Sequence, residues 1–253
     1  MEAVDRALLV LQALADASVD GVTLADLAAR LGLHKTTLHR TLAALRYRGF
    51  VSQDPVSSRY LLGVAATLLG ATYFGEENLP RLLRPALTAV CARAGELVHL
   101  GVLAGTEVVY LDKVEPERAV RVWSAVGRRM PAGTTALGRA ILAFSDVDAS
   151  LLPRYLGRPE GAGDPAVLQQ AVATARSRGY ATESEENEPG IACVAVPLLR
   201  GDDPIAAVSV TVPVERMGRT RAAELAWLLF EVAGARLPDG LRFPSALPFD
   251  QPR

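Results

Sequence analysis

The sequence predicts an α+β protein: an N-terminal winged helix-turn-helix, joined by a linker helix to a C-terminal domain with an antiparallel sheet and flanking helices. Three observations lead to this prediction. Apolar residues recur at helical spacing on both sides of a turn, two short strand-like runs follow, and the second half of the chain alternates strands with helices. We place the DNA-binding domain at residues 1–62, the linker helix at 63–77, the second domain at 78–238 and a loosely held Pro-rich tail at 239–253.

The helix-turn-helix is the clearest of these patterns. Thr23 and Asp26 resemble a capping box at the start of its first helix, and Gly32 is expected to end that helix. The apolar stripe of the first helix consists of Leu24, Leu27, Ala28 and Leu31, and that of the second consists of Leu38, Leu42 and Leu45. An opening helix is expected to complete this small core through Val4, Ala7, Leu8, Leu11 and Leu14.

The charge distribution supports DNA binding, although the chain has a net charge of only −1. Residues 34–61 hold five basic residues and one acid, a local charge of +4, so the remainder carries −5. A basic surface beside a helix-turn-helix is the electrostatic pattern of a protein that contacts phosphates. Exposed Lys and Arg on any solvated helix would look similar, and the local excess favours the DNA interpretation.

The polar face of the second helix contains the candidate DNA contacts. Recognition helices read base edges mainly with their first turns, where an Arg suits guanine and a Thr suits a thymine methyl or a phosphate. Beyond Gly49, the segment D-P-V-S-S separates two strand-like runs and predicts a wing, from which Arg59 would reach a phosphate or the minor groove; the alternative is a solvated turn residue. The expected contacts are Lys35, Thr36, Thr37, His39, Arg40, Tyr47 and Arg59.

The second half predicts two hairpins with helices to one side of a single antiparallel sheet, including a strand at residues 119–124. Cys91 and Cys193 have no C-x-x-C companion, so neither a disulfide framework nor a zinc finger is expected. We expect no metal and no cofactor. The N-terminus is acidic and no run of about 18 apolar residues exists, which predicts a cytoplasmic protein without a membrane segment.

Seven stretches together resemble the IclR family of bacterial transcription regulators. Among them are L-A-D-L-A-A-R-L-G-L-H-K-T-T-L-H-R, G-F-V-S-Q-D-P-V-S-S-R-Y-L-L-G, M-P-A-G-T-T-A-L-G-R-A and G-Y-A-T-E-S-E-E-N-E-P-G-I-A-C-V-A-V-P. His34 stands where proline is frequent in the family, and Thr134 where alanine is common. The resemblance implies a GAF-like effector-binding domain and homodimers, often dimers of dimers, that bind double-stranded promoter DNA.

The resemblance also implies where a small organic-acid effector binds. Residues 130–137 form a small-residue loop that enters a helix, whose N-terminus is a natural carboxylate site; from the residues alone, a plain helix start is the favoured interpretation. Carried over position by position, the effector site consists of Met130, Gly133, Thr134, Ala136, Leu137, Glu183, Ile191, Cys193 and Ser209, of which Ser209 is the weakest. A carboxylate at Glu183 favours an acid that also has a hydroxyl group.

Three functions are compared. A ligand-responsive regulator uses the whole chain, and repression is our default because it needs only occlusion of a promoter, whereas activation needs a polymerase contact. An architectural DNA-binding protein would leave roughly two thirds of the chain without a role. A small-acid-converting enzyme with Cys193 and His99 lacks any local catalytic motif, so no catalytic residue is expected.

Overall fold

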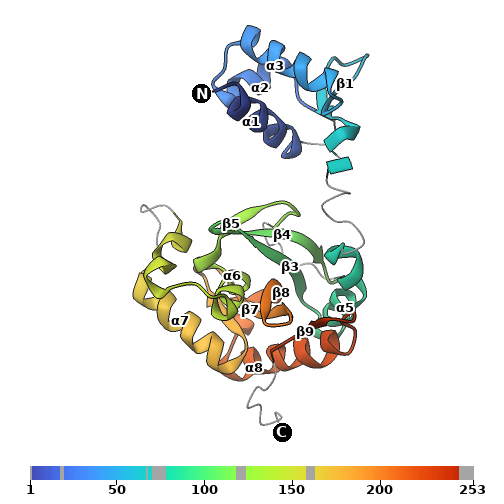
Figure 1. Ribbon diagram of the computed structural model, residues 1–253. Helices are drawn as coiled ribbons and strands as arrows, with labels where there is room; N and C mark the ends of the chain where they lie inside the picture. The colour runs from blue at the N-terminus through green and yellow to red at the C-terminus, as the bar shows by residue number, and fades with distance from the viewer. Residues whose placement is uncertain are drawn as a thin grey trace. The chain divides into compact units, whose positions relative to one another are not determined.

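The computed structural model describes residues 2–17, 20–66, 68–69, 78–117, 124–157 and 163–244 (Figure 1). The chain divides into two compact units, Met1–Asn78 and Leu79–Arg253. Residues 64–66 and 68–69 of the expected linker helix are helical, and its residues 67 and 70–77 lie outside the described part, as do residues 119–123 of the expected strand at 119–124. None of the described helices is long and apolar enough to cross a membrane.

The N-terminal unit is a winged helix-turn-helix. It contains α1 (Ala3–Ala15), α2 (Leu24–Leu31), α3 (Lys35–Tyr47), β1 (Val51–Gln53) and β2 (Tyr60–Leu62). Thr23 is confirmed as the N-cap of α2: its hydroxyl accepts from the Asp26 backbone N–H at 3.1 Å and donates to the Asp26 carboxylate at 2.7 Å. The carboxylate thus contacts the Thr23 side chain, whereas in a capping box it accepts from the backbone N–H of the N-cap residue. Gly32 ends α2 with φ 63°, a left-handed conformation that suits glycine.

The predicted core face of α1 is partly wrong. Val4 and Leu8 are 70% and 56% exposed, whereas Val10 and Ala13 are buried together with Leu14. Since this helix is apolar on almost every side, its own pattern does not say which side faces inward, and packing against α3 decides. The apolar stripes of α2 and α3 are confirmed at Leu27, Ala28, Leu38 and Leu42.

The C-terminal unit contains one antiparallel sheet. The strands run in the order β5-β4-β3-β8-β7-β6, with β9 beside β7. They are β3 (Leu97–Ala104), β4 (Glu107–Val114), β5 (Arg129–Pro131), β6 (Ala181–Ser184), β7 (Ile191–Arg200), β8 (Asp203–Pro213) and β9 (Leu241–Arg242). The helices are α5 (Leu79–Ala94), α6 (Ala136–Phe144), α7 (Pro165–Arg178) and α8 (Arg219–Leu228). Short helical turns cover Ala132–Thr134, Ala149–Leu156, Val214–Arg216 and Leu229–Ala233.

Helices cover both faces of this sheet, which corrects the expectation that they lie to one side. Val196 and Val208 pack under α5 and α8, whereas Ala195 and Ala207, their neighbours in sequence, pack under α6. Because successive residues of a strand point to opposite faces, the two core clusters lie on opposite sides of the sheet. The central strands β3, β8 and β7 are therefore largely buried on both faces, and a polar side chain within them has little access to solvent.

The expected tail also begins later than predicted. Leu241 and Arg242 pair with β7, and Phe243 is 8% exposed, with its ring 5.3 Å from that of Phe230. Burial of an aromatic ring outweighs the turn-forming prolines nearby. Residues 245–253 lie outside the described part of the chain.

Candidate DNA-binding surface and effector pocket

The exposed face of α3 holds the residues that sequence analysis selected. Lys35, Thr36, His39, Arg40 and Tyr47 are exposed, and Thr37 is half-buried. Their outward projection is confirmed, because the leucine stripe of the same helix is buried on the other side. Contact with DNA itself stays a prediction. A groove between α1 and α3 lies beside this face. It is bordered by three basic side chains, Arg6, Arg40 and Arg48.

Arg59 has a structural contact that sequence analysis missed. Its guanidinium donates to the Gly21 carbonyl at 3.0 Å, and this contact ties the wing to the segment before α2. The wing turn is organised separately by the Asp54 carboxylate, which accepts from the backbone N–H groups of Val56 and Ser57 and from the Ser57 hydroxyl. These hydrogen bonds lower the pKa of Asp54. Arg59 is therefore not simply a solvated turn residue, and its contact with DNA stays a prediction.

A second contact inside this unit holds α3 against the wing. The Arg46 guanidinium donates to the Gln53 side chain at 2.6 Å, and both groups are exposed. Arg48 lies over the Tyr47 ring at 5.4 Å. These neighbours constrain where the last turn of α3 presents its basic groups.

The loop that leads into α6 is a capped helix start. Thr135 accepts from the Gly138 N–H at 3.0 Å, and the Thr134 hydroxyl donates to the Pro131 carbonyl at 3.1 Å. A Cβ on Gly133 would lie 2.9 Å from the Tyr155 carbonyl, so this glycine is needed for close packing. Both threonine hydroxyls thus form hydrogen bonds within this loop and the first turn of α6, in agreement with the interpretation of residues 130–137 as a plain helix start.

The structure brings several predicted effector residues onto one face of the sheet. Cys193 of β7 is the register partner of Glu183 on β6 and of Thr211 on β8. Ser209, two residues from Thr211, is the register partner of His99 on β3. Ile191 shares the face of Cys193 by alternation, and Ala136 and Leu137 of α6 belong to the core cluster above it. Met130 packs against that cluster, whereas Gly133 packs against Leu168.

A row of polar side chains, buried except for the half-buried Cys193, crosses this face. The Cys193 Sγ lies 3.3 Å from the Thr211 Oγ1, and the same hydroxyl lies 3.3 Å from the His99 Nδ1. The ring of Tyr110 on β4 continues the row, with its centroid 4.9 Å from that of His99. We define the polar row as Glu183, Cys193, Thr211, His99 and Tyr110.

Several polar atoms at this place have no partner within the described residues. They are the His99 Nε2, the Glu183 Oε1 and the Oδ1 of Asn187, whose side chain lies beside Tyr110, and all three are buried. An unpaired buried polar atom costs roughly 1–3 kcal/mol, so a group of them points to a site built for a polar ligand. The predicted effector site did not include His99, Tyr110, Asn187 or Thr211, and His99 was named only for the enzyme alternative. The available signal was a polar residue inside an apolar strand, as in L-V-H-L and S-V-T-V.

Burial sets the protonation of the row. It lowers the pKa of His99 to about 4, with the Lys113 charge as a second cause, so the imidazole is neutral near pH 7. Burial raises the pKa of Glu183 to about 7, and it raises the pKa values of Cys193 and Tyr110 as well. The site therefore holds neutral donors and acceptors and one carboxyl group that titrates near neutrality.

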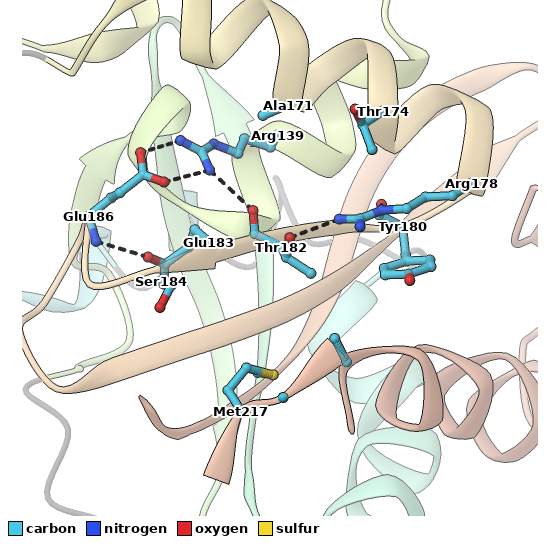
Figure 2. A pocket seen from close by; sticks show the side chains of 12 residues that line it. Arg139, Ala171, Thr174, Arg178, Tyr180, Thr182, Glu183, Ser184, Glu186 and Met217 are labelled. Carbon is cyan, nitrogen blue, oxygen red and sulfur yellow. Dashed lines mark hydrogen bonds and ion pairs between the residues drawn. The ribbon is translucent and has the colours of Figure 1, made fainter. Parts of the chain in front are cut away.

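Arg139 of α6 connects the two loops at the end of the row. Its guanidinium is buried, donates to the Gly133 carbonyl at 2.8 Å and to the Thr182 carbonyl at 3.1 Å, and pairs with both oxygens of Glu186. Figure 2 shows Arg139 pointing toward Glu186 and Thr182. A cavity of about 640 Å³ lies beside these residues, along β6 and against α7 and the start of α8. Arg139 thus holds the loop before α6 and the β6–β7 loop in one arrangement.

A winged helix-turn-helix followed by a separate domain with a buried polar site defines a class, the ligand-responsive transcription regulators. Among the described residues, no group of three or more His, Cys, Asp or Glu is placed to hold a metal ion. The IclR helix-turn-helix domain matches residues 3–55, and the bacterial transcriptional regulator IclR C-terminal domain matches residues 71–235. The chain belongs to the IclR family of bacterial transcription regulators.

Individual relatives extend over nearly the whole chain. It is 32% identical to the HTH-type transcriptional regulator XynR of Escherichia coli over 252 residues, covering 97% of this chain and 99% of the relative. A crystal structure of an IclR regulator from Alicyclobacillus acidocaldarius is 30% identical with a TM-score of 0.73, covering 92% of this chain and 96% of that one. An IclR homologue from Microbacterium hydrocarbonoxydans, crystallised with 4-hydroxybenzoate, has the same fold, with a TM-score of 0.75 at 23% identity over 92% and 98% of the two chains.

Proposed function

We propose that this regulator binds a promoter operator as a homodimer or a dimer of dimers, and that a small organic acid in the second unit changes its DNA affinity. The observation that carries the effector part is the group of unpartnered polar atoms around the polar row. The DNA part rests on the family and on the exposed basic face of α3. Repression is our default, since an occupied operator needs no further contact to block a promoter.

The DNA contacts are assigned to the exposed residues of α3 and to the wing. Arg40 and Lys35, with the hydroxyls of Thr36 and Thr37, face the major groove in this proposal, and His39 and Tyr47 face the backbone. Arg59 contributes a phosphate contact with the N–H groups that Gly21 does not use.

Self-association is supported by apolar side chains on the surface of the first unit. Val4, Leu8 and Val64 are 70%, 56% and 71% exposed. In a two-fold symmetric dimer these residues would pack against their counterparts and set the spacing of the two α3 helices. A ligand whose affinity differs between two dimer arrangements then changes operator affinity by the coupling free energy.

The effector is proposed to be a small acid that also carries a hydroxyl group. The Glu183 carboxyl can accept from such a hydroxyl, and the small residues of the 130–137 loop leave the N-terminus of α6 near the site. The Microbacterium homologue bound to 4-hydroxybenzoate, which has both groups, makes this compound the first probe.

A gel shift on the promoter DNA beside the gene, repeated with 4-hydroxybenzoate and a panel of aliphatic acids, tests this function. We expect a discrete complex whose formation depends on one of the acids. No discrete complex with any promoter fragment, or turnover of an acid, would contradict the proposal. The enzyme alternative is disfavoured because the raised pKa of Cys193 and the lowered pKa of His99 oppose a thiolate–imidazolium pair.

A further inference from the structure

A continuous chain of hydrogen bonds along the polar row can run in two opposite directions. Neutral His99 carries one proton on either Nδ1 or Nε2, and the Thr211 hydroxyl has one proton to donate. Thr211 lies between two neighbours, the His99 Nδ1 and the Cys193 Sγ, at 3.3 Å from each. In a continuous chain, Thr211 donates to one of them and accepts from the other. The direction at one end of such a chain then matches the direction at the other end.

Glu183, at one end of the polar row, is the residue that can change from accepting hydrogen bonds to donating one. Its Oε2 accepts from the Glu186 backbone N–H at 3.3 Å, and its Oε1 has no partner within the described chain. Cys193 is the register partner of Glu183 on the adjacent strand, so its thiol lies beside the carboxyl group and is placed to donate to the oxygen that has no partner. The thiol lowers the pKa of Glu183 against the larger effect of burial. An ionised carboxylate only accepts hydrogen bonds, whereas a protonated one donates one.

We propose that the protonation of Glu183 decides, through Cys193 and Thr211, whether the Nε2 of His99 offers a lone pair or a proton to the effector. This inference rests on the proposed effector site and names the chemistry it selects. With Glu183 ionised, each group donates toward it, the His99 proton is on Nδ1, and Nε2 accepts from a ligand hydroxyl. With Glu183 protonated, each group donates away from it, and Nε2–H binds a carboxylate or carbonyl oxygen.

The change between the two states takes up one proton. A proton arrives at the His99 Nε2, the Nδ1 proton moves to Thr211, the Thr211 proton moves to Cys193, and the thiol proton moves to Glu183. No group in the row becomes a cation, and the only net change is the neutralisation of one carboxylate. Binding of a carboxylate ligand is therefore accompanied by proton uptake when Glu183 starts ionised.

Charged and titratable groups around the row set the pH at which this happens. Tyr110 and Lys113 of β4 and Glu115, which follows that strand, act near His99. Arg139 of α6 acts on Glu183, and Glu186 and Glu188 of the β6–β7 loop lie near Arg139 and Cys193. Since burial raises the pKa of Glu183 to about 7, the change falls near neutral pH.

Nitrogen NMR of the histidine side chains in the full chain tests the relay without any effector. The chain has three histidines, so the His99 signals are assignable with a His99→Gln reference. Between pH 5.5 and 8.5 we expect the proton of His99 to move from Nε2 to Nδ1, without an imidazolium signal. The Cys193→Ser variant retains a donor and an acceptor and should behave likewise.

The Cys193→Ala and Thr211→Val variants each interrupt the row, and in both the His99 tautomer should no longer follow pH. A tautomer that stays constant in the wild type, an imidazolium signal, or a pH response that persists in both interrupted variants would overturn the inference. Because this measurement needs no ligand, it separates failure of the relay from failure of the proposed function. If gel shifts respond to an acid but the His99 tautomer does not change with pH, the proposed function stands and the proton relay is wrong.

Discussion

The two units of this protein differ in where their candidate functional groups lie: exposed on the surface in the N-terminal unit, and buried inside the C-terminal unit. In the N-terminal unit, the candidate DNA contacts project outward from a core that is apolar, and Arg40 is exposed while Leu42 is buried. In the C-terminal unit, the candidate ligand groups lie inside, and His99 and Glu183 are 3% and 4% exposed. The first arrangement suits a large charged partner, and the second suits a small molecule that loses its water on binding.

This difference has an energetic consequence. Exposed charges interact weakly because water screens them, whereas buried polar groups depend strongly on their partners. Equivalent substitutions should therefore have small effects on the stability of the first unit and large effects on that of the second.

The largest expected effect is that of Arg139→Ala. This change leaves the Gly133 and Thr182 carbonyls and the Glu186 carboxylate without their buried partner, and it should destabilise the second unit by about 3–5 kcal/mol. Denaturant unfolding followed by tryptophan fluorescence measures it, because Trp227 of α8 lies in this unit. Arg139→Lys, which keeps the charge, should recover part of the loss; a loss below about 1 kcal/mol for Ala would mean that Arg139 is not structural.

Glu183→Gln should change how stability depends on pH. The folded pKa of Glu183 is raised from 4.5 to about 7, so the wild type loses unfolding free energy as pH rises from 4.5 to 7. The stability of the variant relative to the wild type should therefore increase by up to about 3 kcal/mol between pH 4 and pH 8. His99 contributes the opposite slope below pH 6.5, but equally in both proteins. A constant difference between the two unfolding curves would show that Glu183 does not titrate as described.

Arg40→Ala tests the exposed side of the comparison. Loss of a base contact should weaken operator binding by about 1–3 kcal/mol and leave nonspecific binding nearly unchanged. Arg59→Ala is the matched variant: it should lower both affinities and flatten their salt dependence if Arg59 contacts a phosphate. Gel shifts with operator and scrambled DNA at several salt concentrations measure both, and equal losses for the two variants would remove the division between base and phosphate contacts.

The smallest effect is expected for Arg46→Ala. Its hydrogen bond to Gln53 is short, at 2.6 Å, but exposed, and its loss should destabilise the first unit by about 1 kcal/mol or less. Amide hydrogen exchange along α3 measures this change, and Gln53→Ala is the partner control. A loss comparable to that of Arg139→Ala would erase the proposed contrast between the units.

Much of the fold follows from local patterns. Thr23, Gly32 and the leucines of α2 and α3 act within one or two helical turns, so the helix-turn-helix and its outward-facing residues could be predicted. Strand alternation likewise indicated an antiparallel sheet. The apolar opening helix and the Pro-rich end could not be resolved in the same way, since packing alone selects the buried face of α1 and docks Phe243.

The sequence by itself determined which residues of α3 face outward and so form the candidate DNA-binding surface, because the spacing of residues along one helix decides which of them are exposed. It also placed Glu183, Cys193 and Ser209 in a candidate effector site through resemblance to a family. Only the tertiary structure joined them to His99, Thr211 and Tyr110, which come from strands far apart in the chain. Register across strands brings such residues together, and no local pattern encodes it, so the direction of hydrogen bonds in the polar row is a property of the folded sheet.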